Sequence, residues 1–153
     1  AIIIHPGRDE SSPAEIVDFI KSNKGVIDRT IIGHIERTIY DYEKLESLAK
    51  TGVYLNFDQL GIESSYYPLN PKSYMPSDHQ KIELIKAISD SGFNNKLLLG
   101  HDIYSKNRLK KYGGHGYSHT FQNILMRMEN IGMEKRKIDE IIIKNPQKIL
   151  TFE

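Results

Sequence analysis

The sequence predicts an α/β fold of four parallel strands, each followed by helical sequence, which amounts to half of a (β/α)₈ barrel. Two observations predict it. Four short apolar runs alternate with segments in which apolar residues recur at helical spacing. Three of these runs also end in or next to His or Asp, at the strand ends where such barrels place their sites. The expected strands are residues 1–5, 30–34, 53–57 and 96–101.

Each expected helix has its own start or stop signal. Ser12 and Pro13 are typical of a helix start, and Gly25 follows that helix. Gly52 follows the second helix, and Ser77 precedes the third. The Asn145-Pro146 pair is expected to end the last helix. After the helix that begins near Ser12, the expected helices are residues 42–50, 78–91, 118–130 and 134–144.

Bulk composition narrows the class of protein. The 153 residues suit a single domain, and we expect residues 1–153 to form one. A net charge of +1 gives no electrostatic case for nucleic acid or membrane as a partner. The chain has no cysteine, which excludes disulfides and thiolate metal sites and fits a reducing compartment, so we expect a cytoplasmic location.

A flavodoxin-like sheet is the alternative architecture. That fold would place a glycine-rich phosphate-binding turn after its first strand. The turn here reads Pro6-Gly7-Arg8, which does not have that pattern. The barrel interpretation is therefore favoured.

The strand-end residues predict a metal site. His5, His34 and Asp102 end three separate strands, and imidazoles with a carboxylate are a natural ligand set for a borderline divalent metal. A single His in such a place more often satisfies a buried hydrogen bond, but three ligand-type residues on separate strands favour the metal. Arg8 and Arg37 follow the two His strands and could hold an anionic substrate group, although a surface ion pair is the commoner role of an Arg.

Five segments carry a resemblance to a known family. They are Ile-His-Pro-Gly-Arg at 4–8, Ile-Gly-His-Ile-Glu-Arg-Thr at 32–38, Gly-His-Asp-Ile at 100–103, Lys-Tyr-Gly-Gly-His-Gly-Tyr-Ser-His at 111–119, and Asn-Pro-Gln-Lys-Ile-Leu-Thr at 145–151. With these segments in this order, the chain resembles the phosphotriesterase family of the amidohydrolase superfamily, and within it the phosphotriesterase-related subgroup. The resemblance extends over the whole chain.

The resemblance implies a (β/α)₈ barrel with two bridged divalent metal ions, which we expect to be Zn²⁺. The chain would supply strands 5 to 8 of that barrel with their outer helices, and the N-terminal half, with its His-x-His pair and bridging lysine, would lie upstream of Ala1. His5 and His34 would bind one metal and Asp102 the other. Asp102 would also accept the proton of the attacking hydroxide.

The resemblance also implies a reaction class. The chain departs from the phosphotriesterase proton relay, because Arg37 and Gln59 occupy the matching positions. Members close to this subgroup hydrolyse N-acyl amino sulfonates such as N-acetyltaurine. We therefore expect the complete protein to be a hydrolase of an amide, ester or lactone, with Arg8, Arg37 and Gln59 as substrate-binding residues. The alternative is a catalytically inactive fragment or binding module with a vestigial metal site.

The expected half barrel has two open edges, residues 2–4 and 97–99. Its inward face, which we expect to include Ile3, Ile32 and Leu98, would lack an opposite wall and form an exposed apolar patch. The open edges therefore predict a second copy as a partner, paired edge to edge or in aggregates. The other expected partner is a small-molecule substrate.

Overall fold

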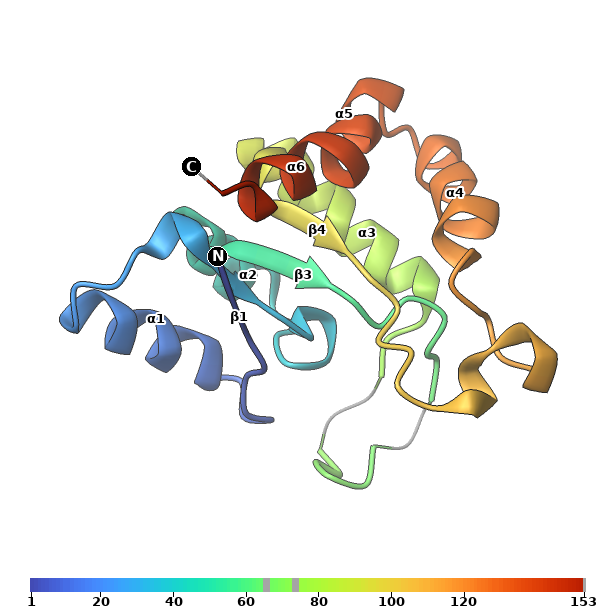
Figure 1. Ribbon diagram of the computed structural model, residues 1–153, viewed down its shortest axis with the longest axis horizontal. Helices are drawn as coiled ribbons and strands as arrows, with labels where there is room; N and C mark the ends of the chain where they lie inside the picture. The colour runs from blue at the N-terminus through green and yellow to red at the C-terminus, as the bar shows by residue number, and fades with distance from the viewer. Residues whose placement is uncertain (65–66, 73–74, 153) are drawn as a thin grey trace.

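The computed structural model describes residues 1–64, 67–72 and 75–152, and it confirms the parallel α/β half barrel. Four strands lie in the order β1-β2-β3-β4, and every neighbouring pair is parallel (Figure 1). The strands are β1 Ile2–Ile4, β2 Thr30–Ile32, β3 Tyr54–Phe57 and β4 Leu97–Leu99. In the loop between β3 and the next helix, residues 65–66 and 73–74 lie outside the described residues.

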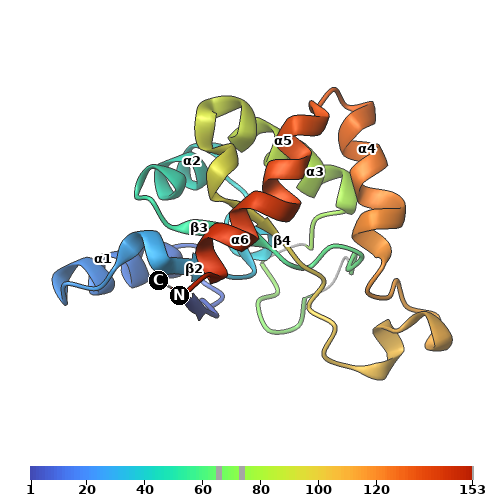
Figure 2. The ribbon, with the colours of Figure 1, turned by 45° about the horizontal axis from the view of Figure 1, so that its top comes forward.

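The helices follow one another around the outside of the sheet, from α1 beside β1 to α5 and α6 beside β4, as Figure 2 shows from a second direction. Their bounds are α1 Ser12–Ser22, α2 Tyr42–Lys50, α3 Asp78–Ile88, α4 Leu125–Asn130, α5 Lys135–Asp139 and α6 Asn145–Leu150. Three single π-helical turns adjoin these helices. Ser89–Phe93 extends α3, Thr120–Ile124 precedes α4, and Glu140–Lys144 joins α5 to α6. The Asp41 side chain caps α2, and Ser77 with Gln80 forms a capping box on α3.

Strand register sorts the apolar side chains onto two faces of the sheet. Ile32 pairs with Leu55, Leu55 pairs with Leu97, and all three belong to the large core that the helices cover. Ile31, Tyr54 and Leu98 point the other way and form a smaller cluster with Ile149 of α6.

The expectation that Ile32 faces inward was therefore wrong. It assumed extended backbone through His34, from which residues would alternate sides. His34 instead has φ 52° and ψ 36°, a left-handed conformation that breaks the alternation between Ile32 and the strand end.

The expected exposed patch on the inward face is also smaller than predicted. Leu98 is only 7% exposed, whereas Ile2 and Ile3 on the edge strand β1 are 54% and 61% exposed. At the opposite edge, the Asn145 side chain donates a hydrogen bond to the Leu97 carbonyl at 2.9 Å, which satisfies part of the β4 edge. Exposed apolar surface on the described strands is therefore concentrated on β1.

The Asn145-Pro146 pair does not end the last helix, contrary to expectation. Asn145 has φ −63° and ψ −49°, and helical backbone continues through Pro146 to Leu150. A proline is tolerated there because it lies in the first turn of α6, after the π-turn Glu140–Lys144. Asn145 also anchors this junction, with its side-chain amide donating to the Asn94 and Leu97 carbonyls.

Within the described part of the chain, none of the helices combines the length and apolar character needed to cross a bilayer.

We predict that the 153-residue chain self-associates through the β1 edge at tens of micromolar, because unpaired strand groups there lie beside exposed isoleucines. Ile3→Lys should shift analytical ultracentrifugation profiles towards the monomer, since a charged edge opposes strand pairing. Phe19→Lys, which replaces a 69%-exposed residue on α1, is the matched control. A monodisperse wild-type monomer would contradict the prediction.

Candidate functional site

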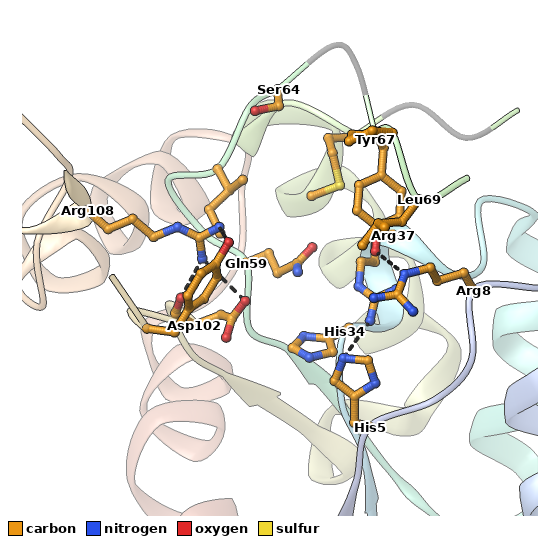
Figure 3. Close-up of a pocket in the computed structure, with 14 residues that line it drawn as sticks. His5, Arg8, His34, Arg37, Gln59, Ser64, Tyr67, Leu69, Asp102 and Arg108 are labelled. Carbon is orange, nitrogen blue, oxygen red and sulfur yellow. Dashed lines mark hydrogen bonds and ion pairs between the residues drawn. The ribbon is translucent and has the colours of Figure 1, made fainter. Parts of the chain in front are cut away.

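A cavity of about 450 Å³ lies where the four strands end. All six residues predicted from the sequence line it (Figure 3): His5, Arg8, His34, Arg37, Gln59 and Asp102. The loops after β3 and β4 add other lining residues, including Tyr67, Tyr104 and Arg108. The volume is that of a small-molecule site.

His5 and His34 lie side by side at the base of this cavity, with ring centroids 4.4 Å apart. The Nδ1 atom of His5 lies 2.8 Å from the Pro6 carbonyl oxygen, and its Nε2 atom lies 3.1 Å from Nη2 of Arg37. A carbonyl can only accept and a guanidinium can only donate, so the proton of His5 is on Nδ1 and the lone pair is on Nε2. This is the tautomer of a histidine that binds a cation through Nε2.

His34 has the same arrangement through a different partner. Its Nδ1 atom lies 2.7 Å from Oδ1 of Asp58, and its backbone N–H donates to the same carboxylate at 3.1 Å. The side-chain amide of Asn56 donates to Oδ2 of Asp58 at 2.8 Å. A carboxylate behind a histidine fixes its tautomer and orientation, as is usual for histidine ligands of metals. Asp58 thus places a proton on Nδ1 of His34, and in the neutral ring the lone pair is then on Nε2.

Asp58 was not among the residues predicted from the sequence. The available signal was its position directly after the third apolar run, at a strand end like the others. Gly100 makes room for it, because a Cβ atom at residue 100 would lie 2.8 Å from the Cβ atom of Asp58. The small residue before His101 is therefore required by close packing between the ends of β3 and β4.

Asp102 lies on the other side of the cavity and pairs with Arg108, a second residue that was not predicted from the sequence. Nη1 of Arg108 lies 3.3 Å from Oδ2 of Asp102 and also bonds the Asp102 carbonyl. The same guanidinium lies 4.0 Å from the ring centroid of Tyr104. Asp102 has a backbone φ of 44°. Like His34, it therefore has a left-handed backbone conformation that residues other than glycine rarely adopt.

The glycine-rich segment helps to position Arg108. A Cβ atom at Gly114 would lie 2.1 Å from the Arg108 backbone carbon, and the Gly116 N–H donates to the Arg108 carbonyl at 2.9 Å. Only a residue without a side chain allows this approach of the two backbone segments.

The donor chemistry of the two histidines fits a divalent cation, but the described residues do not complete a ligand set. Within residues 1–64, 67–72 and 75–152, no three His, Cys, Asp or Glu side chains are grouped closely enough to hold a metal. His5 and His34 are adjacent, whereas Asp102 is held by Arg108. Sites of this kind need at least three protein ligands, so two imidazoles form only part of one.

Glu36 is a buried acid directly behind the site. It is fully buried, and its Oε1 atom accepts the Gln59 backbone N–H at 2.6 Å. Its Oε2 atom is buried without a hydrogen-bond partner among the described residues. Burial, reinforced by the nearby Asp58 charge, raises the pKa of Glu36 to about 8. Glu36 also fixes the backbone of Gln59, whose side chain lines the cavity.

A buried ion pair fastens the loop after β3. Lys81 on α3 is fully buried, and its Nζ atom donates to the Gln59 and Ile62 carbonyls at 2.7 Å and to Asp78 at 3.0 Å. Asp78 also accepts the Gly61 N–H at 2.9 Å. Burial alone would raise the pKa of Asp78, but bonds from Gly61 and His119 and the charge of Lys81 outweigh it, so that pKa is lowered.

The three histidines of the loop after β4 and the start of the next helix lie together behind that ion pair. His119 contacts Asp78 through Nε2 at 2.7 Å, and the rings of His101 and His115 stack with centroids 6.0 Å apart. Burial, together with the neighbouring histidines, lowers the pKa of His101 and His115. These histidines connect the loops and are not among the residues that line the cavity.

Comparison with known proteins identifies the family. The model of the Phosphotriesterase family matches residues 1–150, so the chain belongs to this family. A phosphotriesterase-related protein from Nematostella vectensis is 46% identical over 152 residues, which cover 99% of this chain and 43% of that protein. An N-acetyltaurine hydrolase from Dictyostelium discoideum is also 46% identical, with 41% of its length covered. The chain thus spans about two fifths of the length of these curated relatives.

Solved structures confirm the fold. A resiniferatoxin-binding protein from Rhodobacter sphaeroides superimposes on 97% of the chain with a TM-score of 0.88 at 24% identity. A phosphotriesterase homology protein from Escherichia coli superimposes on 98% with a TM-score of 0.84 at 22% identity. The chain covers 41% and 48% of those two chains, which is consistent with half of a barrel.

We predict that Glu36→Gln stabilises the chain increasingly as pH rises. A carboxyl whose pKa is higher in the folded state supports folding below its ordinary value of 4.5 and loses that support as pH rises towards about 8. Gln retains the oxygen that accepts the Gln59 N–H and does not ionise. Urea unfolding between pH 5 and pH 9 should show that the difference in free energy of unfolding between variant and wild type widens with pH and then levels off. A gap that does not change with pH, or one equalled by the exposed control Glu83→Gln, would refute this assignment.

Proposed function

We propose that the complete protein is a divalent-metal-dependent hydrolase of an amide, ester or lactone, and that residues 1–153 supply half of its barrel as one domain. The observation that carries the proposal is the orientation of His5 and His34, whose Nδ1 atoms face acceptors, so that each neutral ring carries its lone pair on Nε2. At His5 that lone pair accepts from Arg37. Membership of the phosphotriesterase family and the 46% identity to an N-acetyltaurine hydrolase support the reaction class.

In this proposal His5 and His34 help to hold one of two metal ions, for which Zn²⁺ is our expectation, and Asp102 helps to hold the other. When bound, a divalent cation of this kind lowers the pKa of water to about 7 and polarises a carbonyl oxygen. Asp58 keeps the His34 ring in place. Asp102 would accept the proton of the attacking water as its oxygen bonds to the carbonyl carbon, and would return that proton to the leaving nitrogen or oxygen as the acyl bond breaks, while Arg108 orients the carboxylate.

The substrate we propose is an N-acyl amino sulfonate of the N-acetyltaurine type. Two guanidiniums, those of Arg8 and Arg37, line the cavity and suit an anionic substrate. Gln59 and Arg37 occupy the positions that match the proton relay of phosphotriesterases, and neither side chain can relay a proton near neutral pH. Organophosphate hydrolysis is therefore not part of the proposal.

The rival is a non-catalytic module with a vestigial metal site. Two observations favour it: the described residues lack a three-ligand cluster, and the Arg37 guanidinium already contacts Nε2 of His5. The two proposals differ in what the chain does when the rest of a barrel is supplied.

A chimera tests the proposal directly. Residues 1–153 replace the matching C-terminal part of the Dictyostelium N-acetyltaurine hydrolase, and release of taurine is measured. We expect hydrolysis that a chelator abolishes. Asp58→Asn in the chimera should lower activity or metal affinity by about 10–100-fold, because it removes the carboxylate behind a histidine ligand.

The controls separate the two proposals. The isolated 153-residue chain should show no hydrolysis above its His5→Ala variant, because its described residues do not complete a ligand set. A folded chimera without turnover, or turnover that persists in chelator, would favour the non-catalytic module. Metal-dependent turnover by the isolated chain would refute its predicted inactivity.

A further inference from the structure

We propose that Arg29, Lys96 and Lys148 form a binding site for a phosphate monoester at the opposite end of the sheet from His5 and His34. None of these three cations lines the cavity that contains the two histidines. The site is therefore separate from the proposed hydrolase chemistry and does not depend on it. It follows from a second cavity, from the charges that line it and from the neutral groups that hold those charges in place.

This second cavity, the strand-start cavity, has a volume of about 520 Å³ and lies on the side of the sheet where the strands begin. Arg29 directly precedes β2, Tyr54 begins β3, and Lys96 directly precedes β4. Figure 1 shows the end of α6 on the same side of the sheet, where Lys148 and Phe152 join the lining. The other lining residues are Val26 and Asp28.

Strand register explains why Tyr54 and Lys96 share this cavity. Leu55 pairs with Leu97, so Tyr54 and Lys96 lie opposite each other one residue earlier. The ammonium nitrogen of Lys96 lies 4.7 Å from the centroid of the Tyr54 ring, and Tyr54 is only 1% exposed. The sheet therefore holds one cation of the cavity over a fixed aromatic surface.

The cations that line the strand-start cavity outnumber the carboxylates. Arg29, Lys96 and Lys148 are the cations, and Asp28 is the one carboxylate among the lining residues. No ion pair in the described part of the chain involves any of these four residues. The excess of two positive charges matches a phosphate monoester, which carries about two negative charges at neutral pH.

Arg29 is fixed in place by neutral partners. Its Nη2 atom donates to the Thr151 carbonyl at 2.7 Å, and its Nη1 atom donates to the Lys148 carbonyl at 3.4 Å. These bonds attach the guanidinium to the end of α6. They use fewer N–H groups than a guanidinium has, so donors remain for a ligand oxygen. A positioned guanidinium with free donors is well suited to a phosphate group.

The excess of positive charge already acts on Lys96. Burial lowers the pKa of its ammonium, and the neighbouring charge of Lys148 lowers it further, against a smaller opposing effect of Asp28. A dianion bound between the two lysines would replace this repulsion by attraction. Binding of the anion and protonation of Lys96 therefore favour each other.

The walls of the strand-start cavity restrict the rest of the ligand. Val26, Tyr54 and Phe152 contribute apolar surface, and Phe152 is 93% exposed at the rim. An apolar or aromatic body attached to the phosphate would cover this surface. The volume of the cavity suits a small molecule. A phosphate monoester with such a body is therefore favoured over inorganic phosphate.

Binding of simple probes to the 153-residue chain tests the site. Isothermal calorimetry is run at low ionic strength, because salt screens charges at a partly exposed site. The probes are phenyl phosphate and inorganic phosphate, with the neutral benzyl alcohol for comparison. We expect phenyl phosphate to bind more tightly than inorganic phosphate, and about tenfold or more tightly than benzyl alcohol.

Variants locate the binding. Lys96→Met and Lys148→Met should each weaken phenyl phosphate binding by about tenfold or more. Lys135→Met, which removes an exposed ammonium on α5, should leave it unchanged. Arg8→Met changes the other cavity and should also leave the binding that depends on Lys96 unchanged. Circular dichroism establishes that each variant is folded. If Lys96→Met is unfolded, the exposed Lys148 on α6 decides the question.

Nuclear magnetic resonance of lysines methylated with ¹³C gives a second readout at the site itself. The Lys96 signal, assigned with Lys96→Met, should titrate at higher pH when phenyl phosphate is bound, because the dianion stabilises the ammonium. Signals from lysines outside the strand-start cavity should not respond.

Phenyl phosphate binding that survives both lysine substitutions would overturn the site, and so would a titration of Lys96 that the bound ligand leaves unchanged. Tighter binding of inorganic phosphate than of phenyl phosphate would overturn the assignment to a monoester. The measurements involve neither metal nor turnover, so their outcome is independent of the hydrolase proposal.

Discussion

The carboxylate of Asp58 is the group on which the geometry of the site depends. It follows β3, accepts both the backbone N–H and the Nδ1 proton of His34 after β2, and packs against Gly100 after β4. One side chain therefore connects the ends of three strands. Because the backbone of His34 is left-handed, the sheet alone does not dictate where its ring points, and Asp58 supplies that constraint.

A second layer of buried charge keeps the surrounding loops in place. Lys81 and Asp78 fix the loop that carries Gln59, and Asp78 connects that loop to His119. Removing one partner from a buried pair of this kind costs about 3–5 kcal/mol, because the remaining charge is left without compensation. Rigid support matters here because His34, Gln59 and Asp102 belong to different loops, and a cavity between loops retains its shape only if they are held together.

Local signals in the sequence predicted the strands, most of the helices and five of the six cavity residues, whereas Gln59 was predicted only from the family resemblance. Apolar runs indicate the strands and caps indicate the helices, while ligand-type residues at strand ends and the arginines that follow them indicate the site. The errors arose where tertiary contacts override local pattern. Ile32 was placed on the wrong face because alternation fails at the left-handed His34, and helix continues through Asn145 because its side chain bonds the end of the sheet.

The groups that support the site were harder to predict. Arg108 follows no strand directly, and its pairing with Asp102 depends on the close approach of Gly114 to its backbone. Glu36 and Lys81 would be read as surface residues from their charge alone, yet both are fully buried. No periodicity reveals a buried charge whose partners lie more than twenty residues away, as Gln59 does from both.

The proposed site requires that His5 and His34 carry their protons on Nδ1 and direct Nε2 into the cavity. Long-range ¹H–¹⁵N NMR of the imidazoles at pH 8, assigned with His5→Gln and His34→Gln, measures this directly. The structure predicts the Nδ1–H tautomer for both rings and its loss at His34 in Asp58→Asn. A wild-type Nε2–H tautomer at either residue would contradict this assignment, because that histidine would then have no lone pair directed into the cavity.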